Sequence, residues 1–219
     1  SSKAIIQTSA GNEMSQCLSV AMGSIEMSLS NNRMVAETMA RGVEAVQRQA
    51  VKGEQTASDW DAAAYQEILT SFVGSNPETF GGGIWFEPYQ YRPEQRYFSP
   101  YCMRQNGAVT YVDNYSLGEG VYYTDQDWYT NAANTTQKSV WSAPYYDEFA
   151  QISMVTSSAP IYDETGRFLG VATADIDLTQ MQQMVLSLDV VANGRAFLID
   201  DTGGYIADED SEKLLSANI

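Results

Sequence analysis

The chain has 219 residues, of which 44% are hydrophobic and 18% charged, a composition typical of a folded domain with a substantial core rather than a disordered acidic tail. Its net charge of −16 argues against binding to nucleic acid or to an anionic membrane surface, because both partners require a basic face. Histidine is absent, which excludes Ser-His-Asp and Cys-His catalysis and histidine-type zinc sites, and two cysteines are too few for an all-cysteine zinc site.

A long helix is predicted from about residue 11 to residue 51. Its core positions are spaced four and three residues apart without interruption, which is the pattern of a heptad seam. These positions are Leu18, Met22, Ile25, Leu29, Asn32, Ala36, Met39, Val43, Val46 and Ala50. Asn32, the one polar residue among them, would fix the register of a parallel dimer. Two interpretations stay open: a stalk that forms a dimer, or a long amphipathic helix packed on its own domain.

A second helix is expected to end at Gly74-Ser75-Asn76-Pro77, and from Phe80 the hydrophobic period becomes that of strands. Asn106-Gly107 is the strongest short hairpin signal in the chain. The three strands expected in this part cover residues 81–87, 96–103 and 108–112. Residues 114–127 are predicted to form a loop, and Asp127 is expected to cap a short helix.

The central feature of the sequence is a predicted antiparallel hairpin, with strands at residues 154–161 and 168–176 and a turn at Asp163-Glu164-Thr165-Gly166. Aromatic residues and carboxylates lie at both of its ends, which suggests the wall of a pocket. These residues are Trp141, Tyr145, Tyr146, Asp147, Asp175 and Asp177. The alternative is that the tyrosines and tryptophans belong to the core or its rim.

After the hairpin, Thr179 is expected to cap a helix, and two short strands follow at residues 195–200 and from Tyr205. The fold class is therefore α+β. Cys17 and Cys102 lie in different kinds of segment, so no disulfide framework is predicted. The sequence contains no run of eighteen apolar residues and no visible signal peptide, and we expect it to be a fragment excised from a longer protein.

The order of these motifs resembles a known family. GGGIWFEP, the Asn-Gly hairpin, DWYTNA, VWSAPYYD, SSAPIYDETGRFLGVATADIDL and GRAFLIDDTGGYIA follow one another as in the double-Cache (PDC-type) extracytoplasmic sensor domains of bacterial chemoreceptors, sensor kinases and diguanylate cyclases. The resemblance implies a long N-terminal helix beside PAS-like antiparallel sheets. It divides the chain into the helices (1–79), a membrane-distal ligand-binding module (80–190) and the start of a truncated membrane-proximal module (191–219). It also implies a periplasmic location and a parent protein anchored in the inner membrane.

One subgroup of that family binds amino acids through a motif similar to Tyr-x4-Arg-x-Trp-Tyr-x2-Ala, a later Tyr and Asp, and a last Asp. The resemblance assigns six ligand-binding residues here: Gln126, Trp128, Tyr129, Tyr145, Asp147 and Asp175. In the subgroup the arginine binds the ligand carboxylate, and the aspartates and tyrosines bind its amino group. Gln126 replaces that arginine and Val121 replaces the first tyrosine. The resemblance therefore implies that the half of the site for the amine is kept and the half for the carboxylate is altered.

The charge of the same segment supports an amine. Between Gln105 and Gly166 the only basic side chain is Lys138, whereas Asp113, Asp125, Asp127 and Asp147 supply carboxylates. Ammonium groups are bound by carboxylates through charge-assisted hydrogen bonds and by the faces of Trp and Tyr. A cationic or zwitterionic small molecule is therefore favoured over a dicarboxylate or a phosphate.

The sequence thus favours a sensor domain that is not an enzyme and needs no cofactor or metal, with a small amine or amino acid as its ligand and a homodimer through the first helix as a further possibility. Two other classes stay open: a carboxylate-pair enzyme such as a glycosidase, and a structural dimerisation module with a vestigial pocket. Within the sensor class, an organic acid or an uncharged metabolite is the alternative ligand. The receptor's output, whether chemotaxis, kinase or cyclase, is not encoded in this part of the sequence.

Overall fold

The chain divides into two units. The computed structural model describes residues 12–52, 60–112, 115, 122–187, 197–199 and 204–208. The larger unit consists of residues 31–142 and 156–176, and the smaller unit consists of residues 1–30, 143–155 and 177–219. The larger unit contains most of the sheet and of the predicted ligand-binding residues.

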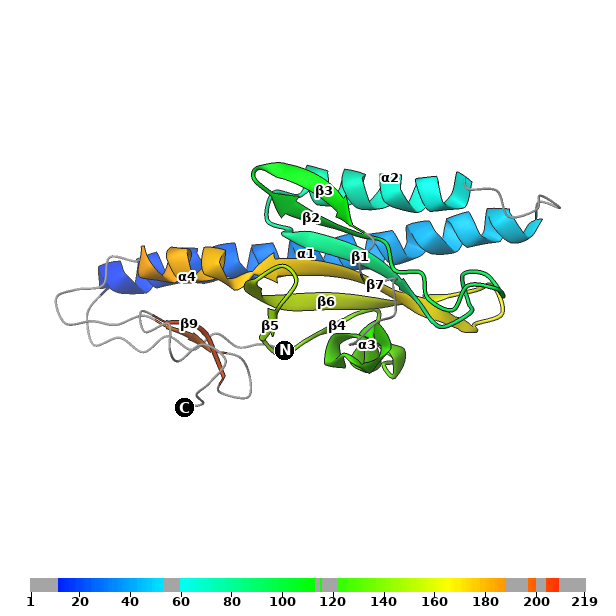
Figure 1. Ribbon diagram of the computed structural model, residues 1–219. Helices are drawn as coiled ribbons and strands as arrows, with labels where there is room; N and C mark the ends of the chain where they lie inside the picture. Colours follow the sequence, from blue (N-terminus) through cyan, green and yellow to red (C-terminus); the bar gives the residue numbers. More distant parts are fainter. Residues whose placement is uncertain are drawn as a thin grey trace. The chain divides into compact units, whose positions relative to one another are not determined.

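The predicted long helix is present as α1 (Asn12–Lys52), drawn in blue in Figure 1. In the larger unit its apolar face contributes to the core of the same chain, where Met39 and Val43 are fully buried. Asn32 is also fully buried, and its Oδ1 accepts a hydrogen bond of 2.9 Å from the Thr79 hydroxyl. The prediction that Asn32 fixes the register of a parallel dimer is therefore wrong, because this side chain is bonded within its own domain.

The second helix, α2 (Trp60–Ser75), ends where it was predicted to end, and an arginine from a strand holds its C-terminus. The carbonyls of a helix's last turn have no partner within the helix. Arg104 supplies one: its Nη2 donates to the carbonyls of Val73 at 2.5 Å and Asn76 at 3.0 Å, and its Nε donates to that of Thr79 at 2.9 Å. This one side chain therefore ties the end of α2 to the sheet.

The sheet of the larger unit has the strand order β3-β2-β1-β7-β6-β4 (Figure 1). The strands are β1 (Gly81–Phe86), β2 (Tyr101–Gln105), β3 (Ala108–Val112), β4 (Val140–Trp141), β6 (Ile152–Tyr162) and β7 (Phe168–Asp177). Asn106 and Gly107 both have positive φ, 51° and 80°, so the predicted two-residue hairpin turn joins β2 to β3. The predicted central hairpin is formed by β6 and β7, and β7 pairs antiparallel with β1.

The strand predicted at residues 96–103 begins only at Tyr101. Pro100 precedes it and has no N–H group to donate to a sheet ladder. The preceding segment still follows β1, because Ile84 N–H donates to the Pro100 carbonyl at 3.0 Å and Phe86 N–H donates to the Phe98 carbonyl at 3.1 Å. The proline therefore shortens the regular strand without separating the segment from the sheet.

The two faces of β1 have different neighbours. Gly82, Ile84 and Phe86 face the helices, where buried side chains of α1 and α2 pack with those of the sheet to form the core. Cys102 is buried on the same face, and burial raises the pKa of its thiol to about 11, so the thiol stays protonated and unreactive at neutral pH. Gly81, Gly83 and Trp85 alternate with these residues and face the opposite side. That opposite face carries the candidate site.

Beyond β4, side chains of α1 bond the outer edge of β6. Arg41 Nη2 donates to the Pro160 carbonyl at 2.8 Å, and Tyr162 N–H donates to Glu44 Oε1 at 3.0 Å. Arg41 and Glu44 also form an ion pair with an N–O distance of 2.9 Å. Pro160 has no N–H to satisfy. Side chains of α1 thus bond the β6 edge at Pro160 and Tyr162, just beyond Ser158, where β4 pairs with it.

The smaller unit contains β5 (Tyr145–Asp147), which pairs with the first residues of β6, and α4 (Leu178–Leu186). Two short strands, β8 (Leu198–Ile199) and β9 (Tyr205–Ala207), pair with each other. The N-cap of α4 is Asp177 and not the predicted Thr179. The Thr179 N–H, which has no partner within the helix, donates to Asp177 Oδ1 at 2.8 Å. None of the helices in the described part of the chain is both long enough and apolar enough to span a membrane.

Candidate functional site

Asp175 of β7 is a buried carboxylate with a hydroxyl on each oxygen. It pairs with Gly81 of β1 and is only 3% exposed. The Tyr101 hydroxyl donates to Oδ2 at 2.8 Å, and the Thr156 hydroxyl donates to Oδ1 at 2.7 Å. Strands on both sides of β7 therefore orient this side chain, which lies on the face of the sheet opposite the helices.

Gly81 makes room for the hydroxyl of Tyr101. A Cβ atom at residue 81 would lie 2.1 Å from the Tyr101 hydroxyl oxygen and 2.7 Å from its Cζ, far inside van der Waals contact. Since residue 81 is also the β1 partner of Asp175, the missing side chain is what lets the tyrosine hydroxyl reach the carboxylate. The glycine run of β1 thus has a packing role at this position.

Trp85 is the centre of an aromatic cluster on the same face. Its ring centroid lies 4.8 Å from that of Trp128, 5.1 Å from Tyr115, 5.5 Å from Tyr123 and 5.7 Å from Tyr101. Its Nε1–H donates to the Thr173 hydroxyl at 2.8 Å, which fixes the orientation of the indole. Tyr101 therefore connects the aromatic cluster to the Asp175 carboxylate.

Gln126, Trp128 and Tyr129 come from the 3-10 turn η2 (Tyr123–Asp125) and the helix α3 (Asp127–Ala133) that follows it. Gln126 is half-buried and is the N-cap residue of α3, without a side-chain capping bond. The predicted cap, Asp127, is instead the first residue of the helix, because the preceding turn places the Gln126 carbonyl to accept the N–H groups of Tyr129 and Thr130.

The hydroxyls of two buried tyrosines in this cluster are bonded to other groups. Tyr129 donates to Glu87 Oε2 at 2.6 Å, and burial and this bond raise the pKa of Tyr129 far above its usual value. Tyr123 donates to the Phe86 carbonyl at 2.5 Å, and burial raises its pKa too. Both therefore stay neutral, and their rings rather than their hydroxyls contribute to the cluster.

Tyr145 and Asp147 belong to the smaller unit, on β5. Asp147 Oδ1 accepts the Ala150 N–H at 2.6 Å, and the Asp147 carbonyl accepts the Gln151 N–H, so this carboxylate shapes the turn between β5 and β6. Of the six predicted residues, the larger unit thus contains Gln126, Trp128, Tyr129 and Asp175, and it connects Trp128 to Asp175 through Trp85 and Tyr101.

Sequence reasoning missed Tyr101, Thr156 and Trp85. Tyr101 lies 74 residues before Asp175, and no local sequence pattern predicts the hydrogen bond between them. The one available signal was the glycine run of β1, because glycines permit another group to approach the backbone closely. The run does not reveal which side chain approaches.

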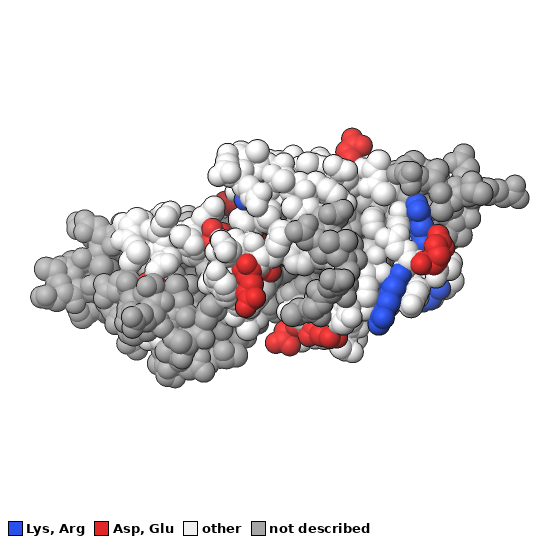
Figure 2. Space-filling model, in the orientation of Figure 1, with Lys and Arg blue, Asp and Glu red and all other residues white. Residues whose placement is uncertain are grey.

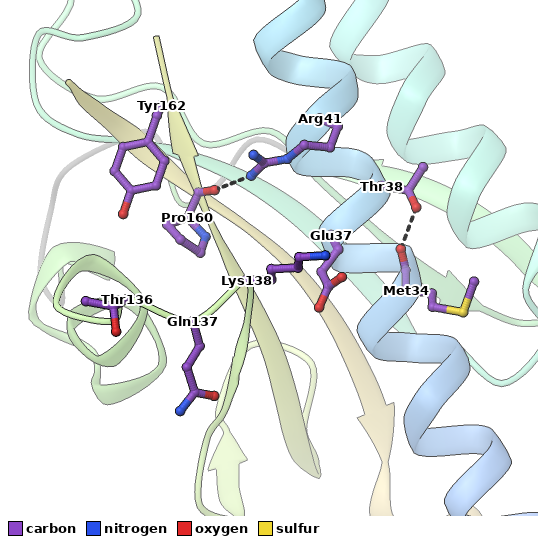
Figure 3. A pocket seen from close by; sticks show the side chains of 9 residues that line it. All are labelled: Met34, Glu37, Thr38, Arg41, Thr136, Gln137, Lys138, Pro160 and Tyr162. Carbon is purple, nitrogen blue, oxygen red and sulfur yellow. Dashed lines mark hydrogen bonds between the residues drawn. The ribbon is translucent and has the colours of Figure 1, made fainter. Parts of the chain in front are cut away.

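Lys138, the one basic residue between Gln105 and Gly166, lies in a separate groove of the larger unit. The groove has a volume of about 490 Å³ and is lined by α1, the segment before β4 and the end of β6. Figure 3 shows Lys138 extending toward Glu37 of α1. In Figure 2 most of the Lys and Arg side chains in view, together with an acidic one, gather at the end with the β1–β2 connection and the β6–β7 turn, and the remaining acidic side chains in view are spread over the rest of this face. Within the described residues, no cluster of three or more Cys, Asp or Glu side chains is arranged to hold a metal ion.

The family of the chain follows from a direct match. The family model described as the methyl-accepting chemotaxis protein-like, first PDC sensor domain matches residues 65–183, which is more than half of the chain. The chain belongs to this family, as the motifs in the sequence predicted. The family consists of sensor domains and not of catalytic domains.

Three curated relatives are methyl-accepting chemotaxis proteins. McpC of Bacillus subtilis is 38% identical over 84 residues, 38% of this chain and 13% of that protein. McpA of Pseudomonas putida is 24% identical over 208 residues, 92% of this chain and 31% of that protein. PscA of Pseudomonas syringae is 30% identical over 138 residues, 55% of this chain and 22% of that protein. The chain thus spans less than a third of the length of each relative.

Solved structures share the fold at low sequence identity. A structure of methyl-accepting chemotaxis protein X superposes with a TM-score of 0.77 at 19% identity, covering 94% of this chain and 77% of that one. The extracellular domain of the histidine kinase mmHK1S-Z3 has a TM-score of 0.71 at 20% identity, covering 89% and 69%. The ligand-binding domain of the Campylobacter jejuni chemoreceptor Tlp3, in complex with 4-methylisoleucine, has a TM-score of 0.65 at 17% identity, covering 94% and 72%. The predicted α+β fold with a long N-terminal helix is confirmed, and the chain is a sensor domain of the kind found in chemoreceptors and histidine kinases.

Proposed function

We propose that the chain is the periplasmic ligand-binding domain of a membrane-anchored chemoreceptor, without catalytic activity, and that it binds a small amine or amino-acid-like molecule at Asp175. The observation that carries this proposal is the buried Asp175 carboxylate, held by two hydroxyls beside an aromatic cluster. A buried carboxylate is stabilised by a cation that forms hydrogen bonds with it, and an ammonium group supplies both the charge and the donors.

The chemistry around Asp175 favours a cation over an anion. Trp85 and Trp128 belong to the aromatic cluster next to Asp175, and the face of an aromatic ring attracts an ammonium group by roughly 0.5 to 2 kcal/mol. Lys138, the one basic residue between Gln105 and Gly166, lines a groove with residues of α1 rather than the aromatic cluster. We therefore propose that Asp175 binds the amino group, that Trp128 and Tyr129 form the wall, and that Gln126 stands where the motif has an arginine for the ligand carboxylate. The resemblance assigns the amino group to Tyr145 and Asp147 of the smaller unit as well.

We also propose a mode of signalling, which rests on a division of the chain into modules. We propose that residues 1–79 are the helical part, residues 80–190 are the membrane-distal ligand-binding module, and residues 191–219 begin a membrane-proximal module. Ligand binding then shifts the population between two arrangements of the distal module according to the difference in affinity, and α1 transmits the change toward the membrane.

A thermal-shift screen of the purified domain followed by calorimetry tests the ligand class. The panel contains amino acids, biogenic and quaternary amines, organic acids, purines and sugars, and it includes matched pairs such as L-isoleucine and 2-methylbutylamine, which differ only in the carboxylate. A ligand at 100 times its Kd stabilises the fold by about 2.7 kcal/mol, which raises Tm by several degrees. Binding of amines or amino acids supports the proposal. Binding of organic acids alone would contradict the amine site.

Gln126→Arg is expected to shift the preference from the amine of each matched pair toward the amino acid. Gln126 caps α3 and is half-buried, so a guanidinium there adds a bidentate partner for a carboxylate next to the aromatic cluster. Calorimetry with both members of a pair measures the ratio of affinities, which we expect to change by about tenfold or more for a charge-assisted bond of roughly 1.5 to 3 kcal/mol. Gln126→Lys is the control for charge alone. An unchanged ratio in Gln126→Arg would remove residue 126 from the ligand site.

The runner-up is a sensor kinase or a diguanylate cyclase whose domain binds an organic acid or another small metabolite. The similarity in fold to the extracellular domain of a histidine kinase supports the kinase as the second candidate. The same screen separates the ligand classes, because an organic acid would then stabilise the domain and the matched amines would not.

We also propose that the domain forms a homodimer through α1, but through a different face from the predicted seam. Val20, Met27 and Met34 are 72%, 64% and 60% exposed and lie seven residues apart, so they form one apolar stripe along the helix. Two copies of such a stripe are complementary to each other in a parallel pair.

Met27→Glu is expected to convert the dimer to a monomer, because it places a charge at the centre of the stripe on both copies. Sedimentation velocity over a range of concentrations measures the change. Arg33→Glu is the control, since this exposed α1 residue lies roughly 100° around the helix from the stripe. A wild-type domain that stays monomeric at high concentration would contradict the dimer.

A further inference from the structure

The Asp175 carboxylate has an environment that would normally favour its protonated form. It is 3% exposed, in the interior of a strand between two other strands, and burial without compensation disfavours a charged group. Two hydrogen bonds offset the cost of burying the charge: the Tyr101 hydroxyl donates to one carboxylate oxygen, and the Thr156 hydroxyl donates to the other. Hydrogen bonds donated to the ionised form favour that form.

The two bonds also fix which way the carboxylate points. Tyr101 reaches it from β2, across β1, and Thr156 reaches it from β6 on the other side of β7. Tyr101 and Thr156 approach different oxygens, and both hydroxyls can donate at the same time to an ionised carboxylate, so the arrangement is compatible with the anion.

The approach of Tyr101 depends on a glycine in β1 and on two neighbouring aromatic rings. Gly81, which pairs with Asp175, has no Cβ that would collide with the tyrosine hydroxyl. The tyrosine ring packs against both Trp85 and Tyr115, at centroid distances of 5.7 and 5.5 Å. The glycine and the two rings therefore place one hydroxyl against one carboxylate oxygen.

We propose that Tyr101 and Thr156 are the positioning residues of the amine site, which hold Asp175 ionised and aimed at the ligand, with Gly81 making room for the Tyr101 hydroxyl. This inference rests on the proposed ligand role of Asp175. These three residues lie outside the Trp-Tyr and Pro-Tyr-x-Asp motifs. Tyr101 and Thr156 act on the ligand through Asp175, and Gly81 acts because it has no side chain.

The test uses the charge state of Asp175 itself, which can be measured without a ligand. Carbon-13 NMR of the aspartate carboxyl groups, assigned with Asp175→Asn, follows the titration of Asp175 in each variant. The groups shown to bond the Asp175 carboxylate are the titratable Tyr101 hydroxyl, which reaches it across β1, and the neutral Thr156 hydroxyl of β6. Asp177, two residues along the chain, has its Oδ1 bonded to the Thr179 N–H. The variants leave Asp177 unchanged.

Tyr101→Phe and Thr156→Val are each expected to raise the Asp175 titration midpoint by about one pH unit, since each removes one hydrogen bond to the anion. Thr156→Ser keeps a hydroxyl and is expected to restore the wild-type midpoint. Tyr123→Phe is the matched control, because it removes a buried hydroxyl of the same aromatic cluster that is bonded to the Phe86 carbonyl instead. Binding of 2-methylbutylamine is expected to weaken about tenfold in the first two variants only.

The outcomes separate this inference from the proposed function. An Asp175 midpoint that is unchanged in Tyr101→Phe and Thr156→Val, or that moves as much in Tyr123→Phe, would overturn the positioning role. If the midpoints move as expected but 2-methylbutylamine does not bind the wild-type domain, the positioning of Asp175 stands and the amine ligand is wrong.

Discussion

Asp175→Ala is expected to weaken the binding of an amine by on the order of 2 to 5 kcal/mol, which is roughly 30-fold to several thousand-fold in Kd, since it leaves a desolvated ammonium group without its partner charge. The burial of Asp175 is the reason for the large effect, because a carboxylate in solvent contributes far less to the binding of a cation. Isothermal titration calorimetry at neutral pH measures it, with the strongest amine of the screen as the probe.

Two further variants decide what the loss means. Asp175→Asn keeps the shape and the possibility of hydrogen bonds with Tyr101 and Thr156 but removes the charge, so it is expected to bind the amine nearly as poorly as the alanine variant. Asp125→Asn removes a carboxylate that is exposed on η2, and we expect it to bind almost normally. Full affinity in Asp175→Asn would show that the charge of residue 175 is not what binds the ligand.

Gly170→Ala is expected to destabilise the larger unit by about 3 kcal/mol or more, and so to lower Tm by about 6 to 12 °C. Gly170 has a φ of 150°, and a Cβ there would lie 2.1 Å from the Trp85 carbonyl oxygen and 2.8 Å from the Phe86 Cα. These contacts are with backbone atoms of β1, so no side-chain rotation relieves them. The paired strands would have to separate where β7 meets the end of β1.

Thermal and urea unfolding of the variant measure this loss. Gly23→Ala is the control, because Gly23 lies inside α1 and a Cβ there would meet no heavy atom within 4 Å. Alanine at that position is expected to leave the fold unchanged or to stabilise it by about 0.5 to 1 kcal/mol. A Tm of Gly170→Ala that matches the wild type would mean that β1 and β7 do not approach each other as closely as the structure has them.

The parts of the fold that sequence patterns predicted are those set by neighbouring residues. The heptad spacing predicted α1 to within one residue at each end, and Asn106-Gly107 predicted a turn whose two residues both have positive φ. The heptad pattern showed that one face of α1 is buried but not which partner buries it. Asn32 is bonded to Thr79, which no count along the helix can reveal.

The predicted N-caps of α3 and α4 were wrong by one and two residues. Asp127 and Thr179 both have side chains that favour an N-cap position. The residue that precedes the first helical turn is decided by the path of the chain before it, which is the η2 turn at Gln126 and the end of β7 at Asp177. Such one- or two-residue shifts arise because several residues near a helix start are suitable caps.

The candidate site was predictable in part. Trp128 and Asp175 were identified from motifs, and the structure connects them through Trp85 and Tyr101. Tyr101 and Thr156 were not identified, because their roles depend on which strands lie side by side. The strand order β2-β1-β7-β6 brings them to Asp175 from two sides, and only the assembled sheet determines this order.

The bonds between α1 and the edge of β6 limit how the helix can move. A displacement of α1 along its axis by one full turn, about 5.4 Å, would carry the Arg41–Pro160 and Glu44–Tyr162 pairs beyond hydrogen-bonding range if the side chains kept their conformations. Sliding of the helix by a turn over a stationary strand therefore requires both bonds to break. Rigid-body movement of α1 together with β6, the strand that also carries Thr156, breaks neither bond and is mechanically the easier path.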